Sequence, residues 1–312
     1  MRSTISLFGI LSGGQIVKYS GIGGQAVLEG IMMRNGDKYA VAVRKPDKEI
    51  DVQVFDYLGP VKSEKVKNIP VVRGVFNFVD SMYLGMTSLL HSASFIEDEE
   101  EIDLEKEKQM MGGVVVLAIL FSIALFFVLP YFISVFFQSF IKSRFVITLL
   151  EGLVRICIFM AYVGGISFMS DIKRTYMYHG AEHKCINCIE QGLELNVENV
   201  RKSSKQHKRC GTSFLFLVVL ISILFFMFIN VESGILKLVI RLLLIPVIAG
   251  VSYEVIRIAG RYDNWLVNII SAPGLFMQKI TTLEPEDDMI EVAIASVEAV
   301  FDWKTWQKEN LS

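Results

Sequence analysis

The sequence predicts a mainly α-helical membrane protein. A four-helix transmembrane bundle of two helical hairpins carries a small N-terminal α+β cytosolic domain and a helical C-terminal tail. Of the 312 residues, 52% are hydrophobic, and the mean hydropathy is +0.46, which is high for a soluble domain. Each apolar segment is long enough for a bilayer span of roughly 20 residues. The loops within each pair are very short, so each pair is expected to form a hairpin. The segments cover about 111–141, 145–169, 212–231 and 235–258.

Residues 1–96 are predicted to form the cytosolic N-terminal domain, a β-meander followed by an amphipathic helix. Ala26 to Arg34 and Lys38 to Arg44 have strand character and flank Asn35-Gly36, a dipeptide that tolerates the positive φ angles of a hairpin turn. Ile50 to Phe55 alternates apolar and polar residues, which is typical of a half-buried strand. No convincing cleavage site follows the first apolar run, so no signal peptide is expected.

The remaining boundaries follow from composition. Val71 to Phe95 has apolar residues at helical spacing over a wide face, which fits either the membrane or the strands. Residues 97–110 are an acidic linker, with eight Asp or Glu between 97 and 108. A transmembrane domain, 111–258, contains a cytosolic loop at 170–211. The tail, 259–312, includes a helix predicted from Asp287 to Trp306.

Basic residues set the expected orientation. The 170–211 loop holds eight Lys or Arg, against three in the other two loops together. The positive-inside rule places this loop and both termini in the cytoplasm of a multi-pass protein of the bacterial inner membrane. The lipid bilayer is then the expected partner. A net charge of −2 and a pI near 6.1 do not suggest nucleic acid, so no nucleic-acid partner is expected. A homo-oligomer stays open, as do three spans with one re-entrant hairpin.

Charged residues lie inside two of the predicted spans. Glu151 and Arg155 are four residues apart in the second span, and Arg241 lies at comparable depth in the fourth. An unpaired charge in a bilayer costs at least ~2.5–3.5 kcal/mol. These side chains are therefore expected to face the bundle and to pair, where they either fix helix packing or form a polar path.

The loop between the second and third spans concentrates metal-binding side chains. Of the four His and four Cys in the chain, three of each lie between residues 179 and 210. His179 and His183 are one helical turn apart, and Glu182 leans over the same face. H-x-x-E-H is the inverted zinc-protease order, in which two His bind zinc and Glu is the general base on zinc-bound water. Zinc lowers the pKa of that water from about 15.7 to about 7.

A second arrangement uses partly different residues. Cys185, Cys188, His207 and Cys210 have the spacing of a structural zinc ribbon or knuckle. Four protein ligands would close the coordination sphere and leave no position for water or substrate. From the residues alone, the catalytic and the structural arrangement both stay open.

Several motifs resemble an uncharacterised family of bacterial multi-pass membrane proteins described as predicted metal-dependent enzymes. The resemblance runs over most of the chain. It rests on Gly23 to Arg34, Arg73-Gly74, Glu151-Gly152 with Arg155, Tyr178 to Lys184, His207, Arg209 to Phe214, and Thr281 to Pro285.

The resemblance also implies which residues bind the metal. The sequence departs from the family pattern at two positions. Lys208 stands where the family has Pro, and Cys185 is not part of its pattern. These departures favour His179 and His183, with Cys210 or His207 as a further ligand and Glu182 as base or ligand, over the four-ligand ribbon. The N-terminal signature also implies roles for Glu29 and Arg34.

The expected function is that of a membrane-bound metal-dependent enzyme, a hydrolase, with its site on the cytoplasmic face and its substrate open. Zinc or another divalent transition metal is the expected cofactor, held by His179, His183, His207 and Cys210, with Glu182 as the catalytic residue. The alternative is a non-catalytic membrane scaffold or assembly factor with a structural metal site. A third hypothesis is a small transporter that uses the charges inside the spans.

Overall fold

The computed structural model divides the chain into two compact units. The first, here called the polar unit, comprises Met1–Ile96, Ser167–Phe216 and Ala249–Ser312, and the second, the apolar unit, comprises Glu97–Ile166 and Leu217–Ile248. Residues 97–103 of the predicted linker and the N-terminal apolar run lie outside the residues that the structure describes, whereas residues 104–110 of the predicted linker are helical. The described residues are 15–16, 19–57, 59, 69–95, 104–229, 231 and 233–311.

The polar unit contains an antiparallel meander in the order β2-β3-β4-β5. Its strands are β2 (Gly23–Val27), β3 (Gly30–Asn35), β4 (Lys38–Arg44) and β5 (Ile50–Asp56). The predicted hairpin is confirmed: Asn35 pairs with Lys38, and Gly36 takes a φ of 60°, in the region that glycine adopts most readily.

The strand predicted from Ala26 to Arg34 is wrong as a single element. It is two strands, because Leu28 and Glu29 make a tight turn and Val27 pairs with Gly30. Glu29 has a positive φ of 47°, an uncommon conformation for a residue with a side chain. Arg174 holds it there, donating from Nε and Nη2 to the two carboxylate oxygens at 2.5 and 2.6 Å.

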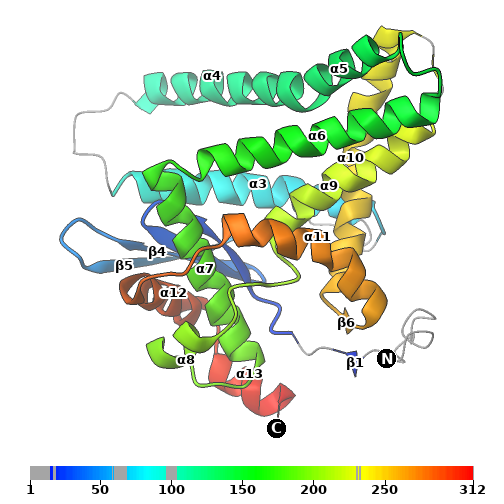
Figure 1. Ribbon diagram of the computed structural model, residues 1–312. Coiled ribbons are helices and arrows are strands. Elements are labelled where there is room, and N and C mark those ends of the chain that lie inside the picture. The colour runs from blue at the N-terminus through cyan, green and yellow to red at the C-terminus, as the bar shows by residue number, and fades with distance from the viewer. Residues whose placement is uncertain are drawn as a thin grey trace. The chain divides into compact units, whose positions relative to one another are not determined.

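Helices cover both faces of the sheet (Figure 1). Ile31 and Met33 face the helices α7 (Ser170–Glu190) and α12 (Asp287–Val300), whereas Met32 faces the helix α3 (Val72–Ala93). Successive strand residues point to opposite faces. This accounts for the continuous apolar run in β3. The polar unit also contains α8 (Val197–Lys202), α11 (Trp265–Thr281) and α13 (Trp303–Asn310), and β1 (Gln15–Ile16) pairs with β6 (Tyr262–Asp263).

The helix predicted from Asp287 to Trp306 ends early, at Val300. Phe301 is extended, with a φ of −139°, and Asp302 caps the new helix α13 by accepting a hydrogen bond from the Thr305 backbone N–H at 3.0 Å. The break turns the end of the chain back onto α7, where Gln307 donates to the carbonyl of Ile189 at 3.0 Å.

The predicted apolar segments form helices close to their expected positions. They are α4 (Leu104–Ile123), a π-helical turn (Ala124–Val128), α5 (Leu129–Phe137), α6 (Arg144–Ile166), α9 (Gly211–Met227) and α10 (Gly234–Ala259). Among the described residues, three stretches are long and apolar enough to cross a membrane: Gly113–Phe137, Arg144–Ile166 and Gly234–Ala259. The helix α9 is shorter, at 17 residues.

The irregular turn before Pro130 has a local cause. Proline has no N–H, so it cannot donate to the carbonyl of Phe126, four residues before it. Arg155 donates to this carbonyl from Nε at 2.8 Å. The side chain of a neighbouring helix thus provides this carbonyl with a donor that Pro130 cannot provide.

The predicted pairing of charges in the apolar unit is confirmed. Glu151 accepts from Arg155 at 2.9 Å and from two nitrogens of Arg241 at 2.5 and 2.9 Å. All three residues are at most 3% exposed. Both guanidinium groups also lie over the ring of Phe226, 5.0 and 4.8 Å from its centroid, where cation–π attraction contributes further.

Candidate metal centre

Three of the four predicted metal ligands come together within the polar unit. The helix α7 places His179 and His183 one turn apart, with ring centroids 4.4 Å from each other. Cys210, immediately before α9, brings its sulfur to 3.2 Å from His179 Nε2. One ligand atom from each of the three residues lies within 4.8 Å of the other two, which is a separation that one ion can bridge at ordinary zinc distances.

Backbone carbonyls orient both imidazole rings. His179 Nδ1 lies 2.8 Å from the carbonyl oxygen of Thr281, and His183 Nδ1 lies 2.7 Å from that of Lys205. A carbonyl only accepts, so each Nδ1 carries a proton, and each Nε2 keeps its lone pair when the ring is neutral. Metal-binding histidines are usually oriented by such a second hydrogen bond.

The three side chains also influence one another's protonation. Burial by itself raises the pKa of the Cys210 thiol, but the imidazoles of His179 and His183 outweigh burial and lower this pKa well below its usual value. Burial disfavours the His179 cation, yet the Cys210 thiolate opposes it and raises the pKa of His179 to about 9. The cluster therefore favours a thiolate, the form of cysteine that binds metals.

Glu182 lies on α7 between the two histidines and is 5% exposed. It is not one of the three clustered ligands. Its Oε1 accepts a hydrogen bond from the backbone N–H of Gly24 at 3.1 Å. A side chain at Gly24 would collide with the carbonyl of Met32 and the sulfur of Met33. The glycine-rich start of β2 thus holds the carboxylate beside the cluster.

Two other residues of the Tyr178-to-Lys184 motif, Gly180 and Lys184, position the segments that pack against α7. A Cβ at Gly180 would overlap the carbonyl of Leu283, so only glycine lets the segment after α11 come this close. The buried amine of Lys184 donates to the carbonyls of Arg201 and Ser203 at 2.7 and 3.0 Å, and it pairs with Glu284 at 3.0 Å. It thereby ties two segments to α7.

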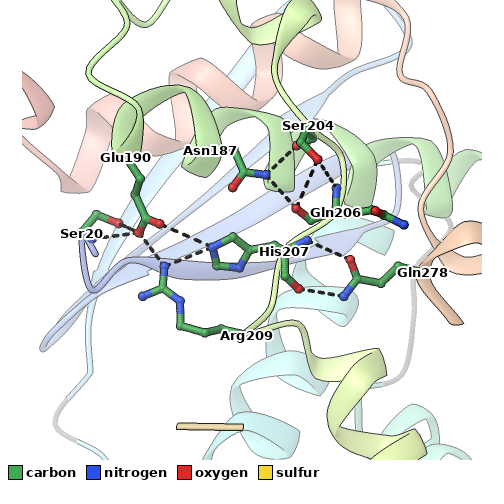
Figure 2. Close-up of polar contacts among 8 residues, drawn as sticks. All are labelled: Ser20, Asn187, Glu190, Ser204, Gln206, His207, Arg209 and Gln278. Atoms are coloured by element: carbon green, nitrogen blue, oxygen red, sulfur yellow. Dashed lines mark hydrogen bonds and ion pairs between the residues drawn. The ribbon is translucent and has the colours of Figure 1, made fainter. Parts of the chain in front are cut away.

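His207, the fourth predicted ligand, is turned to a different network (Figure 2). Its Nε2 lies 3.1 Å from Arg209 Nη2 and 3.6 Å from the carboxylate of Glu190. Its backbone N–H and C=O form a pair of hydrogen bonds with the side-chain amide of Gln278, at 2.9 and 2.7 Å. The structure does not bring His207 into the cluster, although its ring centroid is 5.7 Å from that of His183.

Glu190 is the centre of this second network. Its Oε1 accepts from the N–H and the hydroxyl of Ser20, at 2.8 and 3.0 Å, and from Arg209. Burial raises the pKa of this carboxyl, but His207 and Arg209 outweigh burial and lower the pKa to about 2. The network places the residue before Cys210 and so contributes to the position of the thiolate. The sequence analysis did not single out Glu190, whose partners are far from it in the chain.

Cys185 and Cys188 do not join the cluster. Both are buried in the apolar core that α7 shares with α12. Burial raises the pKa of each thiol, and Cys188 Sγ lies 3.4 Å from the carbonyl of Glu194, as a weak donor would. Within the described part of the chain, the four residues of the ribbon arrangement are not assembled around one point.

Sequence reasoning missed the carbonyls that orient the rings, because backbone atoms carry no residue signature. Thr281 does belong to the Thr281-to-Pro285 motif, and its hydroxyl donates to that of Thr212 at 3.2 Å. Thr212 in turn lies 3.1 Å from Cys210 Sγ. Cys210 also borders an open groove of about 820 Å³, which lies wholly within the polar unit.

Comparison with known proteins identifies the family. A family model described as "Protein of unknown function (DUF1385)" matches residues 69–303. An uncharacterized protein of Bacillus subtilis (strain 168), YqhQ, is 31% identical over 300 residues, which cover 92% of this chain and 94% of that protein. No solved structure matches. Neither description mentions a metal, a reaction or a membrane. The matched region contains the whole His179–His183–Cys210 cluster, and the chain belongs to the DUF1385 family of proteins of unknown function.

Proposed function

We propose that this protein is a membrane-bound metal-dependent enzyme, a hydrolase whose site lies at the cytoplasmic face. The observation that carries the proposal is the convergence of His179, His183 and Cys210, with both histidines held so that Nε2 faces the cluster. Buried polar side chains normally have partners. Here two imidazoles and a thiol share one small volume, and an ion would satisfy all three.

The donor set favours zinc or another divalent transition metal. Imidazole nitrogen and thiolate sulfur are soft to intermediate ligands, whereas magnesium and calcium prefer oxygen. Three protein ligands leave a fourth tetrahedral position for water or substrate, as in catalytic zinc sites. A bound ion of this type supplies a Lewis acid and a water of lowered pKa.

The residues around the cluster match the other needs of hydrolysis. Glu182 is proposed to accept the proton of the attacking water and to pass it to the leaving group. The Gly24 N–H holds one carboxylate oxygen and so restricts the side chain to one orientation. His207 and the Glu190–Arg209 pair act indirectly, because they position the segment that carries Cys210.

The division into units supports an even number of spans. The N-terminal sheet, the 170–211 segment and the C-terminal helices fold together in the polar unit, so they lie on the same side of any membrane. The chain then crosses an even number of times between them, and α9 pairs with α10 as a fourth span. Its 17 residues rise roughly 26 Å, slightly less than the ~30 Å hydrocarbon core.

Cysteine labelling tests this orientation. Lys202 is exposed on α8, and Lys202→Cys should resist a membrane-impermeant maleimide on intact cells but react after permeabilisation. Efficient labelling of intact cells would place the polar unit outside the cytoplasm and contradict the proposal.

Metal content together with function tests the activity itself. The purified wild type is expected to hold about one zinc-like ion per chain, His183→Ala much less, and Glu182→Gln as much as the wild type. Complementation of a deletion strain then separates the hypotheses. Retained metal with lost function in Glu182→Gln supports the enzyme, since a general base acts on water and not on the ion.

The opposite outcomes are equally informative. Retained metal with full function in Glu182→Gln would refute the enzyme and leave the scaffold or assembly factor with a structural ion. Wild-type protein without metal, when purified in the absence of chelators, would refute both.

A further inference from the structure

The helix α3 buries small and polar residues and exposes large apolar ones, the opposite of an ordinary surface helix. The side that packs against the rest of the polar unit is formed largely by small or polar residues: Gly74, Asp80, Gly85, Ser88 and Ser92. The opposite side exposes a stripe of large apolar side chains at helical spacing: Val72, Phe76, Val79, Tyr83, Met86 and Leu90. A stripe of this length is not left facing water in a stable soluble domain.

Close packing explains why the inner side is small. Gly74 lies against Gly250 and Tyr253 of α10, where a Cβ would collide, and Gly85 lies against the side chain of Gln25. Glycines let helices approach closely in membranes. The large residues of α3 therefore face outward because the packing leaves no room for them inside.

The groove beside Cys210 continues this apolar surface. Phe78, Met82 and Met86 of α3 form one wall, and Phe214 and Ile256 form others. The ring centroids of Phe78 and Phe214 lie 5.4 Å apart. Arg209, Cys210 and Gly211 also line the groove. One apolar cavity thus connects the exposed face of α3 with a ligand of the candidate metal centre.

We propose that this groove binds an acyl chain of a bilayer phospholipid and presents the ester linkage of that lipid to the metal centre. The residues that line the groove indicate a lipid as its ligand. Phe214 belongs to the apolar helix α9, and Ile256 to α10, a candidate membrane span. Both residues lie in the parts of these helices that belong to the polar unit, and each helix continues along the chain into a segment proposed to cross the bilayer. The groove also borders the outward apolar stripe of α3. This inference rests on the proposed function and names its substrate class.

The proposed reaction is hydrolysis of the lipid ester, and it needs no reactant other than the lipid and water. Water adds to the ester carbonyl carbon, the bond from this carbon to the glycerol oxygen breaks, and the leaving oxygen takes the proton that Glu182 removed from the water. The products are a fatty acid and an alcohol. The acyl chain occupies the apolar part of the groove, and the ester lies at its Cys210 end.

Photolabelling of the full-length protein tests the binding. The probe is a phosphatidylglycerol with a diazirine near the end of one acyl chain, diluted into phosphatidylglycerol vesicles that contain the protein. Labelled peptides are expected from α3 around Met82 and Met86 and from the start of α9. Glu182→Gln should be labelled to the same extent, because this variant keeps the groove.

Two variants block the groove in different ways. A Cβ at Gly211 meets no atom within 4 Å, so Gly211→Leu extends into the groove and should reduce groove labelling about tenfold. Gly165→Leu, at another open glycine, is its control and should not. Met86→Glu places a charge in the groove without touching Cys210, and Val54→Glu, on an exposed part of β5, is the control for it.

The outcomes separate this inference from the proposed function. Labelling confined to other parts of the protein, or unchanged in both Gly211→Leu and Met86→Glu, refutes the lipid groove while metal content stands. Groove labelling that both variants reduce supports the lipid site. This support holds even if the purified protein contains no metal, a result that would refute the hydrolase alone.

Discussion

His179 Nε2 lies 3.2 Å from the sulfur of Cys210, although 31 positions separate the two residues in the chain. Hydrogen bonds to other segments position both residues. The carbonyl of Thr281 fixes the His179 ring, and the Arg209–Glu190 pair fixes the segment that precedes Cys210. The contact therefore reflects a site assembled from three segments of the polar unit.

Metal stoichiometry should distinguish Cys210 from His207. Cys210→Ala removes a thiolate from the cluster, and one lost ligand of three is expected to reduce zinc affinity at least as much as loss of an orienting group, which costs about 10–100-fold. His207→Ala should keep the ion, because this ring faces Arg209 and Glu190. His91→Ala, remote from the cluster on α3, is the control. Elemental analysis after dialysis measures the difference, and loss of metal in His207→Ala would make His207 a ligand.

Gly180→Ala should weaken the site without removing any ligand. The added methyl group overlaps the carbonyl of Leu283, so the segment that carries Thr281 must move away from α7. Overpacking of this kind costs about 1–3 kcal/mol, and His179 loses its orienting partner. We expect a lower melting temperature in detergent together with weaker zinc retention. Gly165→Ala, where a Cβ meets no atom within 4 Å, should change neither quantity.

Arg155→Ala should destabilise the apolar unit. It removes one of the two arginines that face Glu151, together with the hydrogen bond that Arg155 donates to the carbonyl of Phe126. Breaking a buried ion pair costs about 3–5 kcal/mol, so the melting temperature in detergent should fall by several degrees. Arg155→Lys keeps the charge but not the guanidinium geometry, and should recover only part of the loss. Lys142→Ala, an exposed residue of the same unit, should have no effect. An unchanged Arg155→Ala would show that the pair contributes nothing.

Glu190 should make stability depend on pH. Its pKa is about 2, below the ordinary 4.5. A depressed pKa stabilises the fold above pH 4.5, and this contribution is lost as the pH falls toward 2. Wild type should therefore exceed Glu190→Gln in unfolding free energy by about 3 kcal/mol at pH 7, and the difference should shrink by about 2 kcal/mol at pH 3. Denaturant melts at both pH values measure it. A difference independent of pH would mean that the carboxylate charge is not what stabilises the network.

Local pattern predicted those features whose partners are close in the chain. The turn at Gly36 needs only a residue that tolerates positive φ. The Glu151–Arg155 pair and the His179–His183 pair both follow from four-residue spacing on a helix. By contrast, the turn at Glu29 was missed, because Arg174 on a distant helix stabilises it. The end of α12 was missed because Asp302 starts a new helix within an apolar pattern that continues past it.

The sequence by itself determined that apolar segments form long helices and that a chain poor in His and Cys gathers them in one polar segment. Hydropathy and helical periodicity act over neighbouring residues, so both follow from local composition. Only the tertiary structure decided that Cys210 and not His207 completes the cluster, and that the apolar stripe of α3 faces outward. These outcomes depend on which surfaces pack closely. Gly74 and Gly85 allow one side of α3 to approach its neighbours. The hydrogen bonds that His207 forms with Gln278 and Arg209 hold it outside the cluster.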